Sequence, residues 1–327
     1  MRKTLYTLLL LALASCGGEK KPADTSRELA PAPEFCADSA MACIRRQCEF
    51  GPRIPGTEAH RQCARYITSR FAAYGLQVQA QEATLTAWNG DRLPMTNIVA
   101  SLNPETEMRL LVTAHWDSRP WADNDPDPAN HRTPVLAAND GASGVAVMLE
   151  MARVLSAHPL DWGIDFVCFD CEDYGMAQWA DDTDDDSRGE TWCLGSRTWA
   201  MNPHRDAYTA LSGINLDMVG GRGSVFLREG VSRHYAPDLV ERVWGIAAQL
   251  GYASFFPTGN GGYVTDDHVP VNQILGIPTI DILPHYAHCQ ASSFGPTWHT
   301  VNDTPDNIDP AVLKAVGQVV TTYLCNP

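Results

Sequence analysis

The sequence predicts an α/β fold with a mostly parallel, twisted central sheet and helices on both faces. Short apolar runs alternate with amphipathic stretches along most of the 327 residues. Strands that alternate with helices favour parallel pairing, because each helix returns the chain to the same end of the sheet. Acidic and histidine side chains also follow directly after several apolar runs. Since open α/β sheets bind ligands at the carboxyl ends of their strands, these side chains are expected to share one site.

The expected elements follow one another without an internal repeat. The helices are amphipathic and some carry end signals: Thr57 suits an N-cap, and Gly75 suits the position after a helix. The strands are apolar runs or alternate between apolar and polar residues. In chain order we expect helices at 39–48 and 57–74, strands at 76–88, 95–102 and 108–114, a helix at 143–156, strands at 163–170 and 211–216, a helix at 238–250, a strand at 277–283 and a closing helix at 310–324.

Residues 1–16 have the pattern of a lipoprotein signal segment. A basic start precedes the apolar run 5–14, which is too short to span a bilayer. The tetrapeptide that ends at Cys16 is similar to the site where bacterial lipoproteins are cleaved and lipidated; an ordinary secretory signal that contains a cysteine is the alternative. Residues 17–36 are polar and proline-containing, as in a flexible tether. We therefore expect a membrane attachment through lipid on Cys16 and a place in the bacterial cell envelope, facing the periplasm or the cell surface.

Composition limits the remaining classes of protein. With 44% hydrophobic and 19% charged residues, residues 37–327 can form one large domain, although the length would also allow two. The net charge of −15 repels phosphate backbones, so we expect no nucleic-acid partner. Nothing in the composition indicates a particular oligomeric state.

The ten cysteines allow some disulfides in an oxidising compartment. Four of them cluster near the start and are the best candidates for pairing: Cys36, Cys43, Cys48 and Cys63. Cys168 and Cys171 form a CxxC, but no second CxxC accompanies it, so we interpret both as small buried residues of a core strand.

An acidic run at 181–186 has a spacing that partly matches a calcium loop. Asp182, Asp184 and Asp186 fall at alternating positions and Glu190 follows four residues later, but the turn glycine is missing. A solvated acidic loop is the favoured interpretation.

The stretch 110–153 combines a buried strand, a polar loop and a helix. The strand delivers His115 and Asp117 at its carboxyl end, and Asp140 stands before the small residues that open the helix. Small side chains there allow backbone segments to approach closely. The expected fold thus brings three potential metal-binding side chains to one point.

Other acids and imidazoles follow later strands and complete a candidate zinc site. Zinc accepts imidazole nitrogen and carboxylate oxygen, and a catalytic zinc keeps one position open. Asp140, Asp173 and His299 could be the three ligands, while Asp117 would orient His115. Glu172 stands next to Asp173, and adjacent side chains in an extended turn point apart, so Glu172 could face the substrate as a general base.

Seven motifs in one order resemble the superfamily of zinc-dependent aminopeptidases and glutaminyl cyclases. They are GPRIPGTEAH at 51–60, HWD at 115–117, NDGAS at 139–143, CED at 171–173, NLDMVG at 215–220, DDH at 266–268 and WHT at 298–300. The resemblance covers about residues 37–325. It implies a three-layer α/β/α domain of the zinc aminopeptidase type and a zinc-dependent catalytic function.

Two branches of this superfamily make different predictions. Similarity to the aminopeptidases implies two zinc ions bridged by Asp140, with His115 and Asp217 on one ion and Asp173 and His299 on the other. A zinc-bridging hydroxide would then cleave the peptide bond. Similarity to the cyclases implies one zinc on Asp140, Asp173 and His299, with no metal on the other pair.

Three details favour the cyclase branch. The doubled acid before His268 resembles cyclases, Trp298 adjoins the expected ligand His299, and Trp179 follows the CED motif where cyclases keep a tryptophan in the pocket wall. An aromatic pocket suits a flat glutaminyl side chain and excludes water. One departure concerns metal affinity: the cyclases of animals have Glu-Glu where this chain has Glu172 and the shorter Asp173.

The cyclase branch implies the conversion of N-terminal glutamine of peptides or proteins to pyroglutamate, with release of ammonia. Glu172 would accept the proton of the α-amine and return it to the leaving ammonia. Asp266, hydrogen-bonded to Asp217, would hold the leaving nitrogen, and the two carboxyls would share a proton. A non-catalytic surface lipoprotein that keeps the fold as a binding module is a further alternative, against which the intact Glu172 and ligand set argue.

Overall fold

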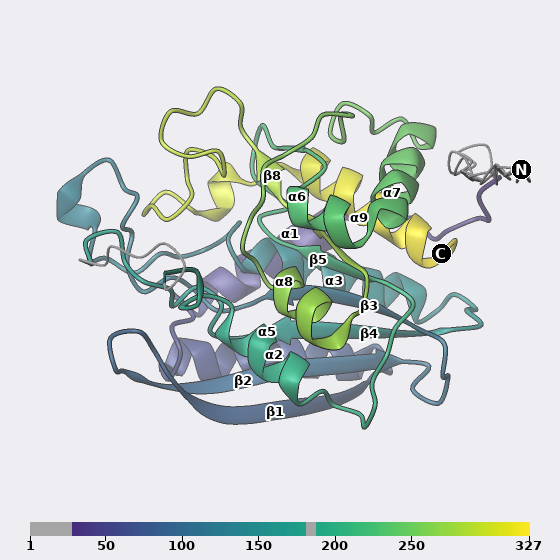
Figure 1. Ribbon diagram of the computed structural model, residues 1–327, viewed down its shortest axis with the longest axis horizontal. Coiled ribbons are helices and arrows are strands. Elements are labelled where there is room, and N and C mark those ends of the chain that lie inside the picture. Colours follow the sequence, from purple (N-terminus) through teal and green to yellow (C-terminus); the bar gives the residue numbers. More distant parts are fainter. Residues whose placement is uncertain (1–27, 181–187) are drawn as a thin grey trace, which may run out of the picture.

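A six-stranded sheet forms the centre of the computed structural model, which describes residues 28–180 and 188–327 (Figure 1). The strand order is β1-β2-β4-β3-β5-β7. The three pairs β3–β4, β3–β5 and β5–β7 are parallel, whereas β1 and β2 form an antiparallel hairpin that joins β4. The bounds are β1 (Gln77–Thr86), β2 (Arg92–Leu102), β3 (Arg109–His115), β4 (Gly163–Phe169), β5 (Gly213–Leu216) and β7 (Thr279–Ile282), with a separate short pair β6 (Val225–Phe226) and β8 (Pro284–His285).

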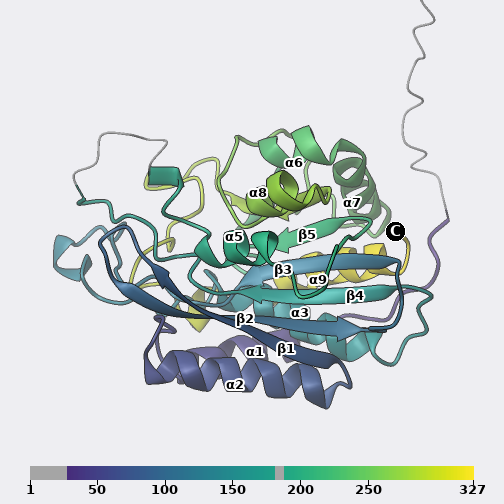
Figure 2. The same cartoon turned by 60° about the horizontal axis from the view of Figure 1, so that its bottom comes forward.

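Helices cover both faces of the sheet, as Figure 2 shows for α1 and α2 on one side and α5 and α8 on the other. On the first face α2 and α3 pack on β2 and β3, and α1, α9 and α7 continue that layer. The helices are α1 (Ala37–Glu49), α2 (Glu58–Ala73), α3 (Ala142–Leu155), α5 (Leu194–Met201), α6 (Gly230–Tyr235), α7 (Pro237–Gln249), α8 (His268–Pro270) and α9 (Pro310–Leu324). The predicted α/β class, with a mostly parallel sheet in three layers, is confirmed.

The alternation of side chains along β3 explains why both faces are covered. Leu110, Val112 and Ala114 point into the larger core with α3 and α9, while Leu111 points into a smaller core with Val167. Successive residues of a strand face opposite sides, so a continuous apolar run needs a partner layer on each side. The apolar strand runs seen in the sequence therefore specify a central sheet.

The structure differs from the expected elements in its later part. Helix α5, the short helix α6 and the pair β6–β8 were not expected from the sequence. All of them are short, and such elements depend more on tertiary packing than on their own periodicity. The longer helices α1, α2, α3, α7 and α9 lie within a few residues of their expected bounds.

The predicted disulfides are wrong, because the nine cysteines of the described residues are free. Cys43, Cys48 and Cys63 are buried in the larger core, where they pack as small apolar side chains, and Cys36 is exposed. Cys168 and Cys171 are also buried, as interpreted from the sequence, and burial raises the pKa of both thiols. Neutral buried thiols of this kind are inert.

The described chain begins packed against the C-terminal helix, and its first segment lies near the C-terminus (Figure 1). The N–H of Ala30 donates to Oδ1 of Asn326 (2.7 Å), and the N–H of Phe35 donates to Oε1 of Gln318 (2.9 Å). The Phe35 side chain is fully buried. The tether expected at 17–36 is therefore wrong for residues 30–36, which belong to the domain.

Two further predictions lie outside the described residues. These are the signal segment 1–16 and the acidic run at 181–186, including Asp182, Asp184 and Asp186. None of the helices in the described ranges combines the length and the apolar character that a bilayer span requires.

Candidate metal centre

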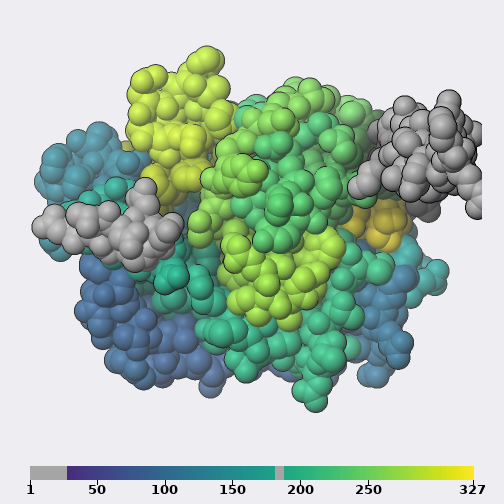
Figure 3. Space-filling model, in the orientation of Figure 1, coloured from purple at the N-terminus to yellow at the C-terminus, as the bar shows by residue number. Residues whose placement is uncertain are grey.

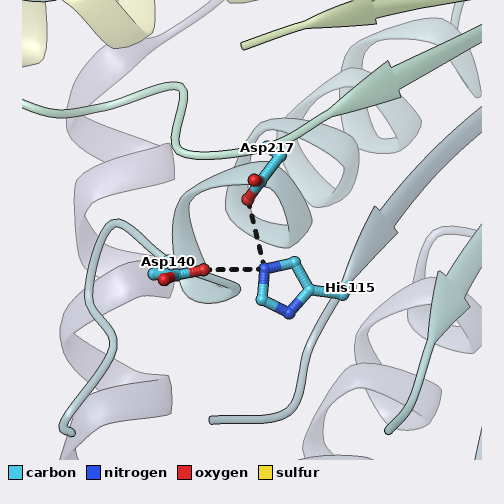
Figure 4. Close-up of side chains that lie close together, drawn as sticks. All are labelled: His115, Asp140 and Asp217. Atoms are coloured by element: carbon cyan, nitrogen blue, oxygen red, sulfur yellow. Dashed lines mark hydrogen bonds and ion pairs between the residues drawn. The ribbon is translucent and has the colours of Figure 1, made fainter. Parts of the chain in front are cut away.

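The carboxyl ends of the parallel strands bring together His115, Asp140 and Asp217 (Figure 4). His115 is the last residue of β3, Asp217 follows β5, and Asp140 lies just before α3. Nε2 of His115 lies 3.0 Å from Oδ1 of Asp140 and 3.1 Å from Oδ1 of Asp217. All three residues are buried, so the two carboxylates and the imidazole interact with little screening by water.

A second group consists of Asp140, Asp173 and His299. Nε2 of His299 lies 3.2 Å from Oδ1 of Asp173 and 3.5 Å from Oδ2 of Asp140. One ligand atom from each residue lies within 4.8 Å of the others. Asp140 therefore belongs to both groups, as a bridging carboxylate would.

The second group fits a divalent metal ion. Oδ2 of Asp140 and Oδ2 of Asp173 are buried, and neither has a hydrogen-bond partner among the described residues. A buried carboxylate oxygen without a hydrogen bond raises the free energy of the folded state, and a bound cation offsets that cost. Two carboxylates and an imidazole form a donor set that zinc accepts, with room for a fourth ligand.

The backbone beside these side chains is held in a rare conformation. Cys171 (φ 56°), Met218 (φ 50°) and His299 (φ 53°) are left-handed although none is glycine. Such positions persist only when the surrounding structure fixes them, and they cluster at functional sites. Each of the three residues belongs to the candidate site or is its direct neighbour in sequence.

Gly141 allows Asp140 to enter the site. Its φ of 99° disfavours any side chain, and an added Cβ would lie 2.6 Å from the carbonyl oxygen of Asp117. The small residues of the NDGAS motif therefore reflect a close approach of two backbone segments.

Asp117 holds two parts of the site in place. Its carboxylate accepts the N–H groups of Glu172 (3.2 Å) and Asp173 (3.1 Å), and its Oδ1 lies 3.4 Å from Nδ1 of His115. The predicted contact between Asp117 and His115 is present. The two bonds to the turn after β4 were not expected from the sequence.

Three supporting residues were missed in the sequence. Asp303 accepts the N–H groups of Asn139 (2.8 Å) and Asp140 (2.9 Å). Asp123 lies 3.5 Å from Nδ1 of His299 and forms a bidentate ion pair with Arg119. Burial alone would raise the pKa of Asp123, but Arg119 and His299 lower it below its usual range. The contacts of Asp303 with Asp140 and of Asp123 with His299 join segments far apart in sequence, so no local pattern signals them.

Glu172 has the properties of a general base. It is buried at the floor of a cavity, and burial raises its pKa well above the usual value; His115 opposes this shift, whereas the charge of Asp267 adds to it. A carboxylate with a raised pKa accepts a proton more readily near neutral pH.

Asp217 and Asp266 interact through their charges, and each has a further partner. Asp217 contacts His115, whereas Asp266 accepts a hydrogen bond from Nδ2 of Asn215 (3.0 Å) and interacts with Asp281. Burial raises the pKa of Asp217 to about 7, with a further increase from the charge of Asp266 and an opposing effect of His115. The two acids are thus coupled through charge.

The cavity above these residues has a volume of ≈ 340 Å³. Its floor holds Asp140, Glu172, Asp173, Asp217, Asp266 and His299, and its walls include Trp192, Tyr263, Phe294 and Trp298. The segment that precedes His299 projects from this face of the molecule, where Figure 3 shows it in yellow-green.

Two tryptophans enclose His299, and only one of them was predicted. The ring of Trp298 stacks on His299 (3.8 Å between centroids), and the ring of Trp192 lies parallel on it (5.8 Å, 9°). The described residues that line the cavity do not include Trp179, which packs against Trp121 and lies under Arg132. The tryptophan in the cavity wall is therefore Trp192 and not the expected Trp179. The Trp192 ring fits there because Gly175, which lies against it, has no side chain.

A mostly parallel sheet with a group of carboxylates and imidazoles at its carboxyl edge defines an α/β protein with a candidate metal site of the aminopeptidase type. The family model "Peptidase family M28" matches residues 97–324, and the chain belongs to this family. The superfamily predicted from the seven motifs is thereby confirmed.

Solved structures of high similarity include bacterial glutaminyl cyclases and also a leucine aminopeptidase precursor from Bacteroides thetaiotaomicron, which is 45% identical with a TM-score of 0.87 over 91% of this chain and 100% of that one. The enzyme of Bacteroides thetaiotaomicron, bound to N-acetylhistamine, is 45% identical with a TM-score of 0.88, and the alignment covers 91% of this chain and 100% of that one. The enzyme of Tannerella forsythia is 49% identical with a TM-score of 0.86 over 90% and 100% of the two chains.

A curated relative belongs to the other branch. Aminopeptidase YwaD of Bacillus subtilis is 28% identical over 254 residues, which are 74% of this chain. The chain spans only 47% of the length of that aminopeptidase.

Proposed function

We propose that this protein is a zinc-dependent glutaminyl-peptide cyclotransferase, which converts N-terminal glutamine to pyroglutamate and releases ammonia. The observation that carries the proposal is the aromatic cavity directly above the group Asp140, Asp173 and His299. Glu172 lines the same cavity and does not belong to that group of candidate ligands. The similarity to glutaminyl cyclases at 45% and 49% identity supports the same activity.

Asp140, Asp173 and His299 would hold one zinc ion. When bound, zinc supplies a Lewis acid that polarises the γ-carbonyl of the substrate glutamine. Asp123 and Arg119 orient His299 and Asp173 for this role, since Arg119 also donates to the carbonyl oxygen of Asp173 (3.1 Å). The shorter Asp173, in place of glutamate, reaches His299 at 3.2 Å, so both belong to one ligand set.

Glu172 moves the proton in this reaction. Its carboxylate accepts a proton from the α-amine as that amine attacks the γ-carbonyl, which closes a five-membered lactam. The same proton then passes to the departing nitrogen, which leaves as ammonia. Asp266 lies in the same cavity floor and would hold the leaving nitrogen. Because amine and carbonyl belong to one residue, the cavity need only fold the side chain back on itself.

The aromatic walls favour cyclisation over hydrolysis. Trp192, Phe294 and Trp298 form an apolar part of the wall above the ligands, where a flat glutaminyl side chain would displace water. Water that stayed in the cavity would compete with the α-amine as the nucleophile.

The second candidate function is a two-zinc aminopeptidase. The observation in its favour is the group His115, Asp140 and Asp217, which shares Asp140 with the first group. The similarity to aminopeptidase YwaD points the same way. In the cyclase, His115 would stay without metal and balance the charges of Asp140 and Asp217.

One assay separates the two functions. Peptides that begin with glutamine or with leucine are offered to the purified protein, and ammonia, pyroglutamyl product and free amino acid are measured. We expect ammonia and pyroglutamyl product from the glutamine peptide and no free leucine from the other. Free leucine together with two zinc ions per chain would support the peptidase instead.

The cell location is also a proposal. Lipid on Cys16 would anchor the mature protein in the bacterial cell envelope. We expect a Cys16→Ala variant to lose incorporation of labelled palmitate and to appear in the soluble fraction. Equal labelling of both proteins would contradict the lipid anchor.

A further inference from the structure

A second cavity of ≈ 210 Å³ adjoins the cavity above the metal centre. The two share four lining residues: Tyr263, Val264, Leu283 and Phe294. The second cavity, called here the adjoining cavity, continues past this shared wall toward Leu227, Pro284 and His285. It is thus an extension of the candidate active site, and the mechanism proposed above does not use it.

Tyr263 is placed as the partition between the two cavities. Its side chain is 75% exposed, although it is a large aromatic residue. It follows the glycine-rich segment 259–262, and its ring lies over Gly230, where an added Cβ would be 2.8 Å from the ring. An aromatic ring held against the backbone and open to solvent on its other side is a ready contact surface for a ligand.

The adjoining cavity favours an uncharged occupant. Its one buried acid, Glu229, is fully engaged: its carboxylate accepts N–H groups from Val231 (2.7 Å), Ser232 (2.6 Å) and Val264 (3.0 Å). His268 adds a contact at 3.3 Å. No unpaired charge of Glu229 therefore reaches the cavity, and most of the other lining side chains are apolar or aromatic, with His285 and Ser293 as the polar ones.

The short distance between consecutive residues of a peptide places the second residue of the substrate near the adjoining cavity. The Cα atoms of consecutive residues lie about 3.8 Å apart across a trans peptide bond. If the glutamine side chain occupies the floor beside Glu172, the next side chain must lie within one residue of it. The adjoining cavity shares the wall that Tyr263 and Phe294 form, so it borders the space that this next side chain would enter.

We infer that the adjoining cavity is the binding site for the side chain of the residue after the N-terminal glutamine, that it selects apolar side chains, and that Tyr263 packs on that residue. This inference rests on the proposed cyclotransferase function and specifies its substrate class. Tyr263 is a specificity-determining residue in this assignment, because it acts on the choice of peptide and takes no part in the proton transfer of Glu172.

The test compares the peptides Gln-Gly-Ala and Gln-Leu-Ala by ammonia release. For the wild-type protein we expect kcat/KM to be about 10-fold higher for the leucine peptide, the size of effect expected for an apolar side chain in its own pocket. In Tyr263→Ala this ratio falls to near one. Tyr263→Phe keeps it, because the ring and not the hydroxyl makes the contact.

Tyr235→Ala is the matched control, since Tyr235 is a second exposed tyrosine (40%) that lines a different cavity with Leu211 and Pro278, near the starts of β5 and β7. Its peptide ratio should equal that of the wild type. A ratio near one in the wild-type protein, or an equal loss on both peptides in Tyr263→Ala, would overturn the inference. No ammonia from either peptide would overturn the proposed function, and the inference with it.

Discussion

Glu172 and Cys193 touch across the candidate site: Oε1 of Glu172 lies 3.3 Å from Sγ of Cys193. The N–H of Cys193 also donates to the carbonyl oxygen of Glu172 (3.2 Å). Burial raises the pKa of Cys193 well above its usual value, so the thiol stays neutral and can donate to the carboxylate. The start of α5 therefore fixes both the backbone and the side chain of Glu172, which then faces the cavity in one orientation.

Replacing Glu172 with glutamine removes the proton acceptor and keeps the shape of the side chain. We expect kcat to fall by about 10²- to 10⁴-fold, the usual contribution of a general base. Zinc content and the free energy of unfolding should stay close to those of the wild type, because Glu172 is not among the expected ligands. The matched control is Glu190→Gln, on a less buried acid of the next loop. Unchanged ammonia release by the Glu172 variant would remove it as the base.

Metal content distinguishes the two groups of ligands. In His299→Ala we expect the zinc to be lost, since this side chain faces Asp140 and Asp173. In His115→Ala we expect one zinc per chain to remain, as in the wild type, because His115 is not a zinc ligand in the proposed cyclotransferase. Mass spectrometry of the metal in purified protein gives the count. Two zinc ions in the wild type, reduced to one in His115→Ala, would instead support the aminopeptidase.

The parts of the site that follow apolar strands could be predicted from the sequence. His115, Glu172, Asp173 and Asp217 each stand at the end of an apolar run, and parallel strands end at one edge of the sheet, so their convergence follows from the fold class. Asp140 could be placed because small residues and a helical pattern follow it.

The remainder depends on contacts between distant loops. The ring of Trp192 can lie on His299 because Gly175, beside that ring, has no side chain. Asp303 holds Asp140 in place by accepting the backbone N–H groups of Asn139 and Asp140. Every residue except proline has such an N–H group, so this contact has no sequence pattern. The contacts of Asp266 with Asn215 and Asp281 could not be predicted for the same reason, since those two residues come from strands whose register the sequence does not reveal.

Gly141 should tolerate alanine much less than Gly75 does. Both have positive φ, but an added Cβ at Gly141 would lie 2.6 Å from the carbonyl oxygen of Asp117, whereas nothing lies within 4 Å of one at Gly75. We expect Gly75→Ala to reduce the free energy of unfolding by about 1 kcal/mol, the cost of the left-handed conformation. Gly141→Ala should reduce it by roughly 2–4 kcal/mol and displace Asp140, because steric overlap adds to that cost. Chemical denaturation and zinc content measure the two effects, and equal stability of the variants would show that the close approach of Asp117 is not rigid.

The zinc-free protein should lose stability as the pH rises from about 4 to about 7. Burial raises the pKa of Asp217 and of Asp303 to about 7 each, with added repulsion from Asp266 and Asp140 respectively. These carboxyls are protonated in the folded state over a range where the unfolded chain has already released its protons. The folded state then binds more protons than the unfolded state, so the free energy of unfolding falls as the pH rises through this range, by several kcal/mol.

His115 acts in the same direction, because a histidine whose pKa is raised in the folded state stabilises that state only while it remains protonated. Zinc should reduce the dependence, since a cation balances the ionised carboxylates. Denaturation of the chelator-treated protein at pH 5 and pH 7.5, with and without zinc, measures the change. A metal-free protein that is more stable at pH 7.5 than at pH 5 would show that these carboxyls are not held protonated by the fold.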